Sequence, residues 1–112
     1  ALPIYDEYIS NLGRRIEKCE IFPKGTNVNF VRVQSRNEFQ VRTWERGAGL
    51  TMACGTGACA SQVANVLNDK TQNTATAHLK GGDLLIEWAK DGCVFMTGPC
   101  EYVYNGDYMK DL

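Results

Sequence analysis

Cys54 lies in a sequence setting that suits a reactive thiol. It stands in "ACGTGACA", followed by Gly55 and Gly57 and by an alanine-rich segment that predicts a helix. Glycines have no side chains, so the first backbone N–H groups of that helix, which lack intrahelical partners, can approach a ligand. The helix dipole adds partial positive charge at the same end, which favours a thiolate at Cys54 or a bound carboxylate. Thr56 adds a hydroxyl in the first turn. The pattern indicates a thiol that acts as a base or a nucleophile.

This segment has two other interpretations. A cysteine is most often a small buried hydrophobe, and this is the expected role of Cys59, inside the helix, and of Cys19, Cys93 and Cys100. "GTGACA" also fits the dinucleotide-binding pattern G-x-G-x-x-A. That pattern requires a strand leading into its first glycine, and "GLTMAC" is a poor strand.

The elements that must position Cys54 follow from hydrophobic periodicity. We expect a helix over 4–18, with Gly13 breaking or capping its first part, and a second helix over 55–68. The second helix is apolar around nearly its whole circumference, which predicts burial. Alternating and β-branched segments predict strands over 28–34, 38–46, 73–80, 83–89, 93–97 and 101–104. The sum is an α+β fold, much of it antiparallel, around one buried central helix.

Composition limits the class of protein. With 112 residues the chain suits a single domain, and its 12 basic and 13 acidic residues are scattered, so we expect neither nucleic acid nor an anionic membrane as a partner. No apolar run is long enough to span a bilayer, and no signal peptide is recognisable. Five cysteines, an odd number, favour a reducing, cytoplasmic location over a disulfide framework. There is no CxxC pair and only one histidine, His78, so no metal site is expected.

Three segments carry a resemblance to a known family. "FPKGTNVNFV", "RTWERGAG" and "ACGTGACA", in this order and spacing, resemble the C-terminal half of diaminopimelate epimerase, and the closing "GPCEYVYNGDY" is similar to the end of that family. The resemblance implies that residues 1–112 are the C-terminal domain of a two-domain enzyme. It also implies a diaminopimelate epimerase-like fold, a mixed and mostly antiparallel sheet curled around a central helix. The implied reaction is the conversion of LL- to meso-diaminopimelate, for lysine and peptidoglycan synthesis, without cofactor or metal.

The resemblance also implies roles for single residues. Cys54 matches one of two catalytic cysteines, and Gly55 and Thr56 match residues that hold the α-carboxylate of the substrate. Glu45 and Arg46 match the pair that binds the distal ammonium and carboxylate. Asn27 matches an asparagine that hydrogen-bonds the same distal group, whereas Asn29 is expected to be an ordinary exposed strand position.

Strand geometry gives a separate expectation for Glu45 and Arg46. Adjacent residues on a regular strand point to opposite faces. To meet one substrate group, the strand must therefore end or bend at this pair, and the "GAG" that follows is where such a bend is expected.

The main departure from the family is an absent domain. The family's N-terminal domain carries the second cysteine in a "CGNG"-like motif, which this chain lacks, and Leu50 stands where the family often has an acidic residue. The chain alone is therefore expected to be inactive or nearly so, with the missing N-terminal domain as its partner. A homodimer that brings two Cys54 thiols face to face is a weaker alternative. Two other functions stay open, another cysteine-pair amino-acid racemase of the same superfamily and a non-catalytic carboxylate-binding module.

Overall fold

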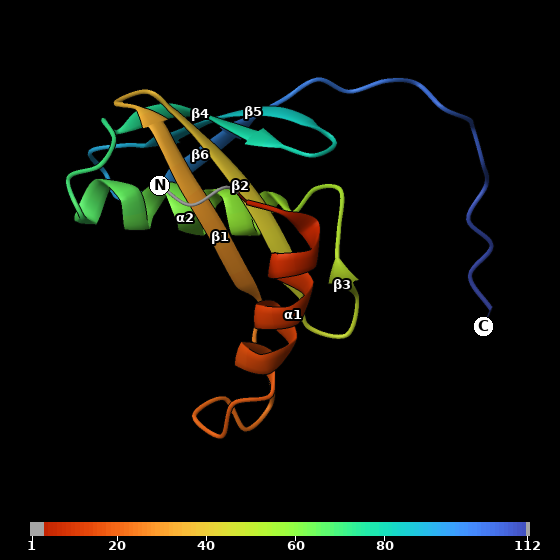
Figure 1. The fold of residues 1–112 in the computed structure, drawn as a ribbon. Coiled ribbons are helices and arrows are strands. Elements are labelled where there is room, and N and C mark those ends of the chain that lie inside the picture. Colours follow the sequence, from red (N-terminus) through yellow and green to blue (C-terminus); the bar gives the residue numbers. More distant parts are fainter. Residues whose placement is uncertain (1–3, 112) are drawn as a thin grey trace.

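The computed structural model describes residues 4–111 and has the α+β architecture that the sequence predicts (Figure 1). Its elements, in chain order, are α1 (Asp6–Glu17), β1 (Val28–Ser35), β2 (Glu38–Glu45), β3 (Gly49–Leu50), α2 (Gly55–Leu67), β4 (Thr74–Leu79), β5 (Gly82–Trp88) and β6 (Val94–Thr97). No helix among these residues is long and apolar enough to cross a membrane.

The strands form one mixed sheet in the order β1-β2-β4-β5-β6, with the short β3 paired to β2. All pairs are antiparallel except β2 with β4, which run parallel over three residue pairs. This agrees with the expected sheet. The predicted strands lie within one or two residues of the observed ones up to residue 97, and β3 is an addition.

The core lies between the sheet and α2. Phe39 and Val41 alternate along β2 and are buried, because in a strand every second side chain faces the same side. They pack with small and branched residues from α2, β4 and β5, namely Ala58, Ala75, Ala77 and Ile86. The small alanines let the helix lie close to the strands, which fixes the position of the helix relative to the sheet.

Helix α2 buries a partly polar side. Gly57 and Ala58 are covered together with Ser61, Gln62 and Asn65, whereas its other side, with Leu67 at 71% exposure, faces outward. Gln62 is fully buried and both ends of its amide are bonded: Nε2 donates to the carbonyl of Gln72 at 2.8 Å, and Oε1 accepts from the Thr71 hydroxyl at 3.0 Å. Buried polar groups need such partners to offset the loss of water.

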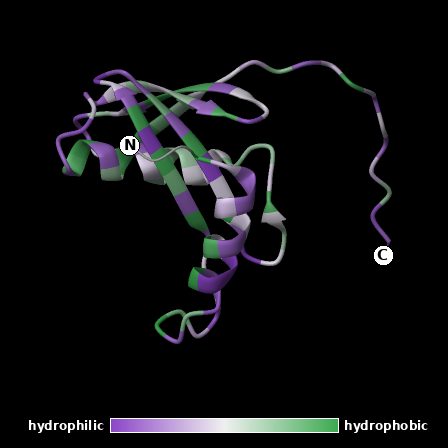
Figure 2. Ribbon diagram, viewed as in Figure 1, coloured by the Kyte–Doolittle hydropathy of each residue, from purple (hydrophilic) through white to green (hydrophobic). Residues whose placement is uncertain are grey.

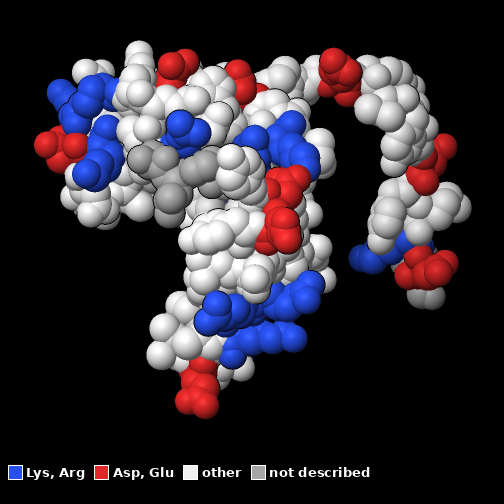
Figure 3. Space-filling model, viewed as in Figure 1, with Lys and Arg blue, Asp and Glu red and all other residues white. Residues whose placement is uncertain are grey.

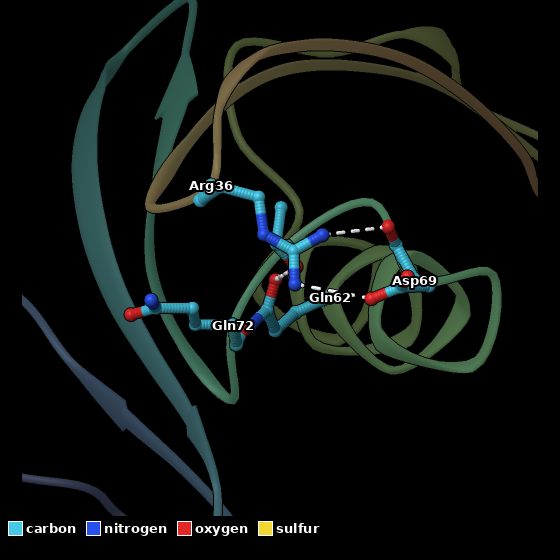
Figure 4. A network of polar contacts seen from close by, with 5 residues as sticks. Arg36, Gln62, Asp69 and Gln72 are labelled. Carbon is cyan, nitrogen blue, oxygen red and sulfur yellow. Dashed lines mark hydrogen bonds and ion pairs between the residues drawn. The ribbon is translucent and has the colours of Figure 1, made fainter.

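A second set of contacts ties the end of α2 to the β1–β2 turn (Figure 4). The guanidinium of Arg36 donates to the carbonyl of Asp69 at 2.7 Å and to its carboxylate at 3.1 Å. The backbone N–H of Gln72 donates to the carbonyl of Arg36 at 2.7 Å. These contacts anchor the C-terminal end of α2 to the β1–β2 turn. Cys54 lies at the opposite, N-terminal end of the same helix.

Helix α1 packs against the opposite face of β2. It is continuous through Gly13, so the predicted break or cap there is wrong. A Cβ on Gly13 would lie 2.7 Å from both Cβ and Cγ of Trp44, so the glycine allows close packing instead of ending the helix. Figure 3 shows acidic side chains over the first turn of α1 and basic ones over its last turn, an order that complements the helix dipole.

The predicted strand over 101–104 is also wrong. After β6 the chain runs away from the sheet as an extended tail with no regular structure through residue 111 (Figure 1). Hydrophobic residues recur along this tail (Figure 2), and Tyr102, Val103 and Tyr104 are each at least 77% exposed. These aromatic and β-branched residues favour a strand, but a strand forms only beside a neighbour that satisfies its N–H and C=O groups.

Candidate active site

Cys54 is the N-cap residue of α2. Its backbone is extended (φ −142°, ψ 102°), and the helix begins at Gly55, as the sequence predicts. The N–H of Gly57 donates to the Cys54 Sγ at 3.4 Å, and the Thr56 hydroxyl lies 3.6 Å from the same sulfur. The sulfur therefore takes the place of the side-chain oxygen that usually caps a helix. Cys54 is 8% exposed, so it is shielded from bulk water.

The start of α2 carries partial positive charge and lies beside Met96 of β6. The first turn of α2 carries no acidic side chain, so its partial positive charge is not offset within that turn. Gly55 lies against Met96 of β6, since a Cβ there would be 3.0 Å from the Met96 Sδ. Met96 is half exposed and was not among the sequence candidates. Its thioether covers one side of the helix start and leaves Thr56 exposed.

Strand β2 ends at Glu45, where strand geometry predicts an end or a bend. Gly47 (φ 81°) and Gly49 (φ 78°) have the left-handed backbone that lets the chain turn back as β3. Thr43 faces α2 and Trp44 faces α1, so alternation along β2 directs Glu45 to the same side as Thr43. Arg46 lies beyond the end of the strand, and its Cδ would be 3.0 Å from a Cβ on Gly25.

Asn27 and Arg46 are brought together. The Asn27 side-chain carbonyl accepts the backbone N–H of Arg46 at 2.8 Å, and the Arg46 guanidinium donates to the carbonyl of Lys24 at 3.2 Å. Both contacts hold the turn after β2 against the loop that precedes β1. The predicted site residues thus form two groups. Cys54, Gly55 and Thr56 lie at the start of α2, and Asn27 lies with Arg46. Glu45 is the last residue of β2, directly before Arg46.

The structure places one unexpected side chain beside Cys54. Asn29, expected to be an ordinary exposed position, is half-buried and accepts a hydrogen bond from the Thr43 hydroxyl at 2.8 Å. A Cβ on Gly57 would lie 2.5 Å from Asn29 Oδ1, 3.0 Å from Thr43 Oγ1 and 3.1 Å from Cys54 Sγ. Asn29, Thr43 and Cys54 therefore converge on the bare Cα of Gly57.

A β-bulge sets the pairing of Asn29 with Thr43. Ser35 pairs with Glu38 across the turn, and regular counting from there would set Asn29 opposite Trp44. The register shifts by one residue between Val33 and Ser35, so Asn29 faces Thr43 instead. A shift of one residue changes which face a side chain shares, and a bulge is not visible in the residue pattern.

The other cysteines have different surroundings. Cys59 packs against the core as expected, and burial, together with the nearby Cys54, raises the pKa of its thiol. Cys19, Cys93 and Cys100 are exposed, so their expected packing role is wrong. They lie in or beside loops and the tail, where no apolar surface covers them.

Comparison with protein families identifies one match that covers most of the chain. The family model described as "Diaminopimelate epimerase" matches residues 4–103. A diaminopimelate epimerase of Desulfitobacterium hafniense is 56% identical over 100 residues, which are 89% of this chain and 35% of that protein. A diaminopimelate epimerase of Bacillus licheniformis is 53% identical over 102 residues, 89% of this chain and 36% of that protein. The chain thus spans about a third of the length of the curated relatives it matches.

Solved structures share the fold at low sequence identity. A phenazine biosynthesis protein of the PhzF family from Bacillus anthracis superposes with a TM-score of 0.59 at 16% identity, covering 83% of this chain and 30% of that one. A putative PhzC/PhzF phenazine biosynthesis protein from Clostridium difficile gives a TM-score of 0.56 at 14% identity, covering 80% and 31%. At these identities the likeness concerns the fold alone.

Proposed function

Because the chain belongs to the diaminopimelate epimerase family, we propose that it supplies one half of the active site of a cofactor-independent diaminopimelate epimerase. In this proposal residues 1–112 act as the C-terminal domain, and the N-terminal domain of the longer protein supplies the second thiol. The observation that carries the proposal is Cys54 at the start of α2, with its sulfur against the Gly57 N–H and the Thr56 hydroxyl. The free cysteines fit the cytoplasmic location that we propose with it.

The proposed reaction uses two thiols on opposite faces of the substrate α-carbon. The Cys54 thiolate takes the α-proton from one face, the electron pair stays on the carbon beside its carboxylate, and the second thiol delivers its own proton to the other face. Such a carbanion needs donors aimed at the carboxylate where charge develops. The N–H groups of Gly55 and Thr56, at the start of α2, are the donors that we assign to this task.

The distal end of the substrate is assigned to Asn27 and Arg46 together with Glu45, which ends β2. Glu45 would bind the distal ammonium, and Arg46 the distal carboxylate with two parallel N–H donors. Asn27 supports this group because its amide holds the backbone of Arg46. A substrate without both distal charges would not need this pair, which favours diaminopimelate over the substrates of other cysteine-pair racemases.

The test is exchange of the α-proton of diaminopimelate in deuterated water. The chain is assayed alone and then mixed with a separately produced N-terminal half of a related epimerase, with Cys54→Ala as the control. Exchange in the mixture only, and its loss in Cys54→Ala, is the expected result. Exchange by the chain alone would instead favour the homodimer with two Cys54 thiols. If the halves bind each other and no exchange occurs, the non-catalytic carboxylate-binding module is favoured.

A further inference from the structure

We infer that Asn29 and Thr43 are positioning residues that set the reactivity of the Cys54 thiol. The inference gains its catalytic meaning from the proposed function, but it rests on contacts that need no substrate. Thr43 is 4% exposed and its hydroxyl donates to Asn29 Oδ1 at 2.8 Å. The two residues pair directly across β1 and β2, so their side chains share the face of the sheet that α2 covers.

Gly57 brings this pair into contact with the cysteine. Its backbone N–H donates to Cys54 Sγ, and the place of its missing Cβ is surrounded by Asn29 Oδ1, Thr43 Oγ1 and the sulfur itself. Gly57 does not have the left-handed backbone of Gly47 or Gly49, so it is needed for space and not for conformation. The first turn of α2 therefore rests on the Asn29–Thr43 pair, with the sulfur beside it.

The hydrogen bond between Thr43 and Asn29 determines how the Asn29 amide oxygen can interact with the Cys54 sulfur. An amide oxygen carries partial negative charge and disfavours a thiolate nearby. The Thr43 hydroxyl donates to that oxygen and so takes up part of its acceptor capacity. Without this hydroxyl, the half-buried Asn29 Oδ1 would lose its hydrogen-bond partner and could accept from the Cys54 thiol, which borders the same Cβ position of Gly57. This hydrogen bond would stabilise the thiol form of Cys54 relative to its thiolate form.

The two residues thus have opposite effects on the sulfur. Thr43→Val keeps the shape and removes the hydroxyl, so the reaction of Cys54 with iodoacetamide should become slower by about threefold to tenfold, the value of one such hydrogen bond. Asn29→Asp places a full negative charge in the same position and should slow the reaction further. Asn29→Ala removes the acceptor, so it should not slow the reaction, and Thr43→Val in the Asn29→Ala background should react at nearly the rate of the unchanged chain.

The measurement is the rate at which iodoacetamide alkylates Cys54 in the full chain between pH 6 and pH 9. Mass spectrometry of the peptide that contains Cys54 gives this rate. Peptide masses separate Cys54 from Cys19, Cys93 and Cys100, and fragment ions separate it from Cys59, which lies in the same tryptic peptide. Thr74→Val and Asn73→Ala are the matched controls, since Thr74 is an exposed strand residue and Asn73 donates to the Trp88 carbonyl at 3.0 Å in another part of the sheet. Far-UV circular dichroism and the urea midpoint confirm that each variant is folded.

A purely structural role would give a different pattern. It would give all destabilised variants similar alkylation rates at Cys54. It would also move the rate of the double variant further from that of the unchanged chain than Thr43→Val alone does. If Thr43→Val reacts like Thr74→Val, or if Asn29→Ala does not restore the rate, the inference is overturned. The test is independent of the proposed function: absence of α-proton exchange would overturn that proposal and leave the alkylation pattern in place.

Discussion

Gly13 of α1 lies directly on Trp44 of β2, with no room for a methyl group between the helix and the indole. A Cβ there would approach two Trp44 side-chain atoms to 2.7 Å, and these atoms are close to the backbone and cannot swing away. On the other side of the same strand the neighbouring Thr43 supports α2. Both helices are therefore held against a single stretch of β2 by contacts that depend on a glycine.

Gly13→Ala should destabilise the chain even though alanine favours helices. The gain in helix propensity is about 1 kcal/mol, whereas forcing a methyl group into a packed contact costs roughly 1–3 kcal/mol. Urea unfolding measures the net change. Asn11→Ala, at an exposed position of the same helix, is the control and should be neutral or stabilising. A Gly13→Ala chain as stable as Asn11→Ala would contradict the close contact.

Gln62→Leu should destabilise the chain by about 2–4 kcal/mol. It keeps much of the side-chain volume but leaves the Thr71 hydroxyl and the Gln72 carbonyl without their partner, and each unsatisfied buried group costs roughly 1–3 kcal/mol. The control is Gln72→Ala, because Gln72 is exposed and contributes to this network through its backbone. Equal urea midpoints for the two variants would show that the buried amide is not important for stability.

The stability of the chain should fall as pH rises past the titration of His78. Its Nδ1 lies 2.8 Å from the Asp83 carboxylate and its Nε2 lies 3.5 Å from Glu38, and the hydrogen bond to Asp83, more than the contacts with Glu38, raises the pKa of His78. A raised pKa contributes stability that is present below the unfolded value of about 6.5 and lost as pH rises through the folded value.

The Asp83→Asn variant isolates this effect. Its free energy of unfolding should depend less on pH between 6 and 8 than that of the unchanged chain, and the difference between the two should shrink as the pH approaches 8. The groups are partly exposed, so the difference should be modest and should decrease further in high salt. Parallel pH profiles would exclude a contribution from this pair.

Arg46→Met should weaken the binding of diaminopimelate in the reconstituted two-part enzyme. Loss of a charged pair of hydrogen bonds to the distal carboxylate should raise KM by about tenfold to a hundredfold with a smaller change in kcat. The α-proton exchange assay gives both values. Lys24→Met is the control: the Lys24 side chain is exposed, and its known contact with Arg46 is made by its backbone carbonyl.

Glu45→Gln tests the other end of the same assignment. It should impair the exchange of diaminopimelate selectively, because a neutral amide binds an ammonium group less strongly than a carboxylate does. Exchange with an unchanged KM would favour another amino-acid racemase of the superfamily.

The parts of the fold that the sequence predicted are those set by local patterns. The start of α2 at Gly55 and the end of β2 at Glu45 follow from glycine positions and from alternation, which act over a few residues. The position of Asn29 depends on a bulge near Gln34 and on a helix that lies across the sheet, so no local pattern predicts it. The predicted helix break at Gly13 is wrong for the same reason, because the Trp44 side chain that requires a glycine there comes from another part of the chain.

The extended tail after β6 has a practical consequence for work with this chain. Residues 99–111 make no ladder and expose large side chains such as Tyr108 (89%) and Met109 (84%), so an added protease would cut here before it reached the sheet. Asn29, Thr43 and Cys54 all precede the tail in sequence, so a chain trimmed after residue 98 would keep the whole group intact. The same exposed side chains would make the untrimmed chain adhere to surfaces and to its own copies, and trimming is therefore the simplest route to a sample fit for crystals or spectroscopy.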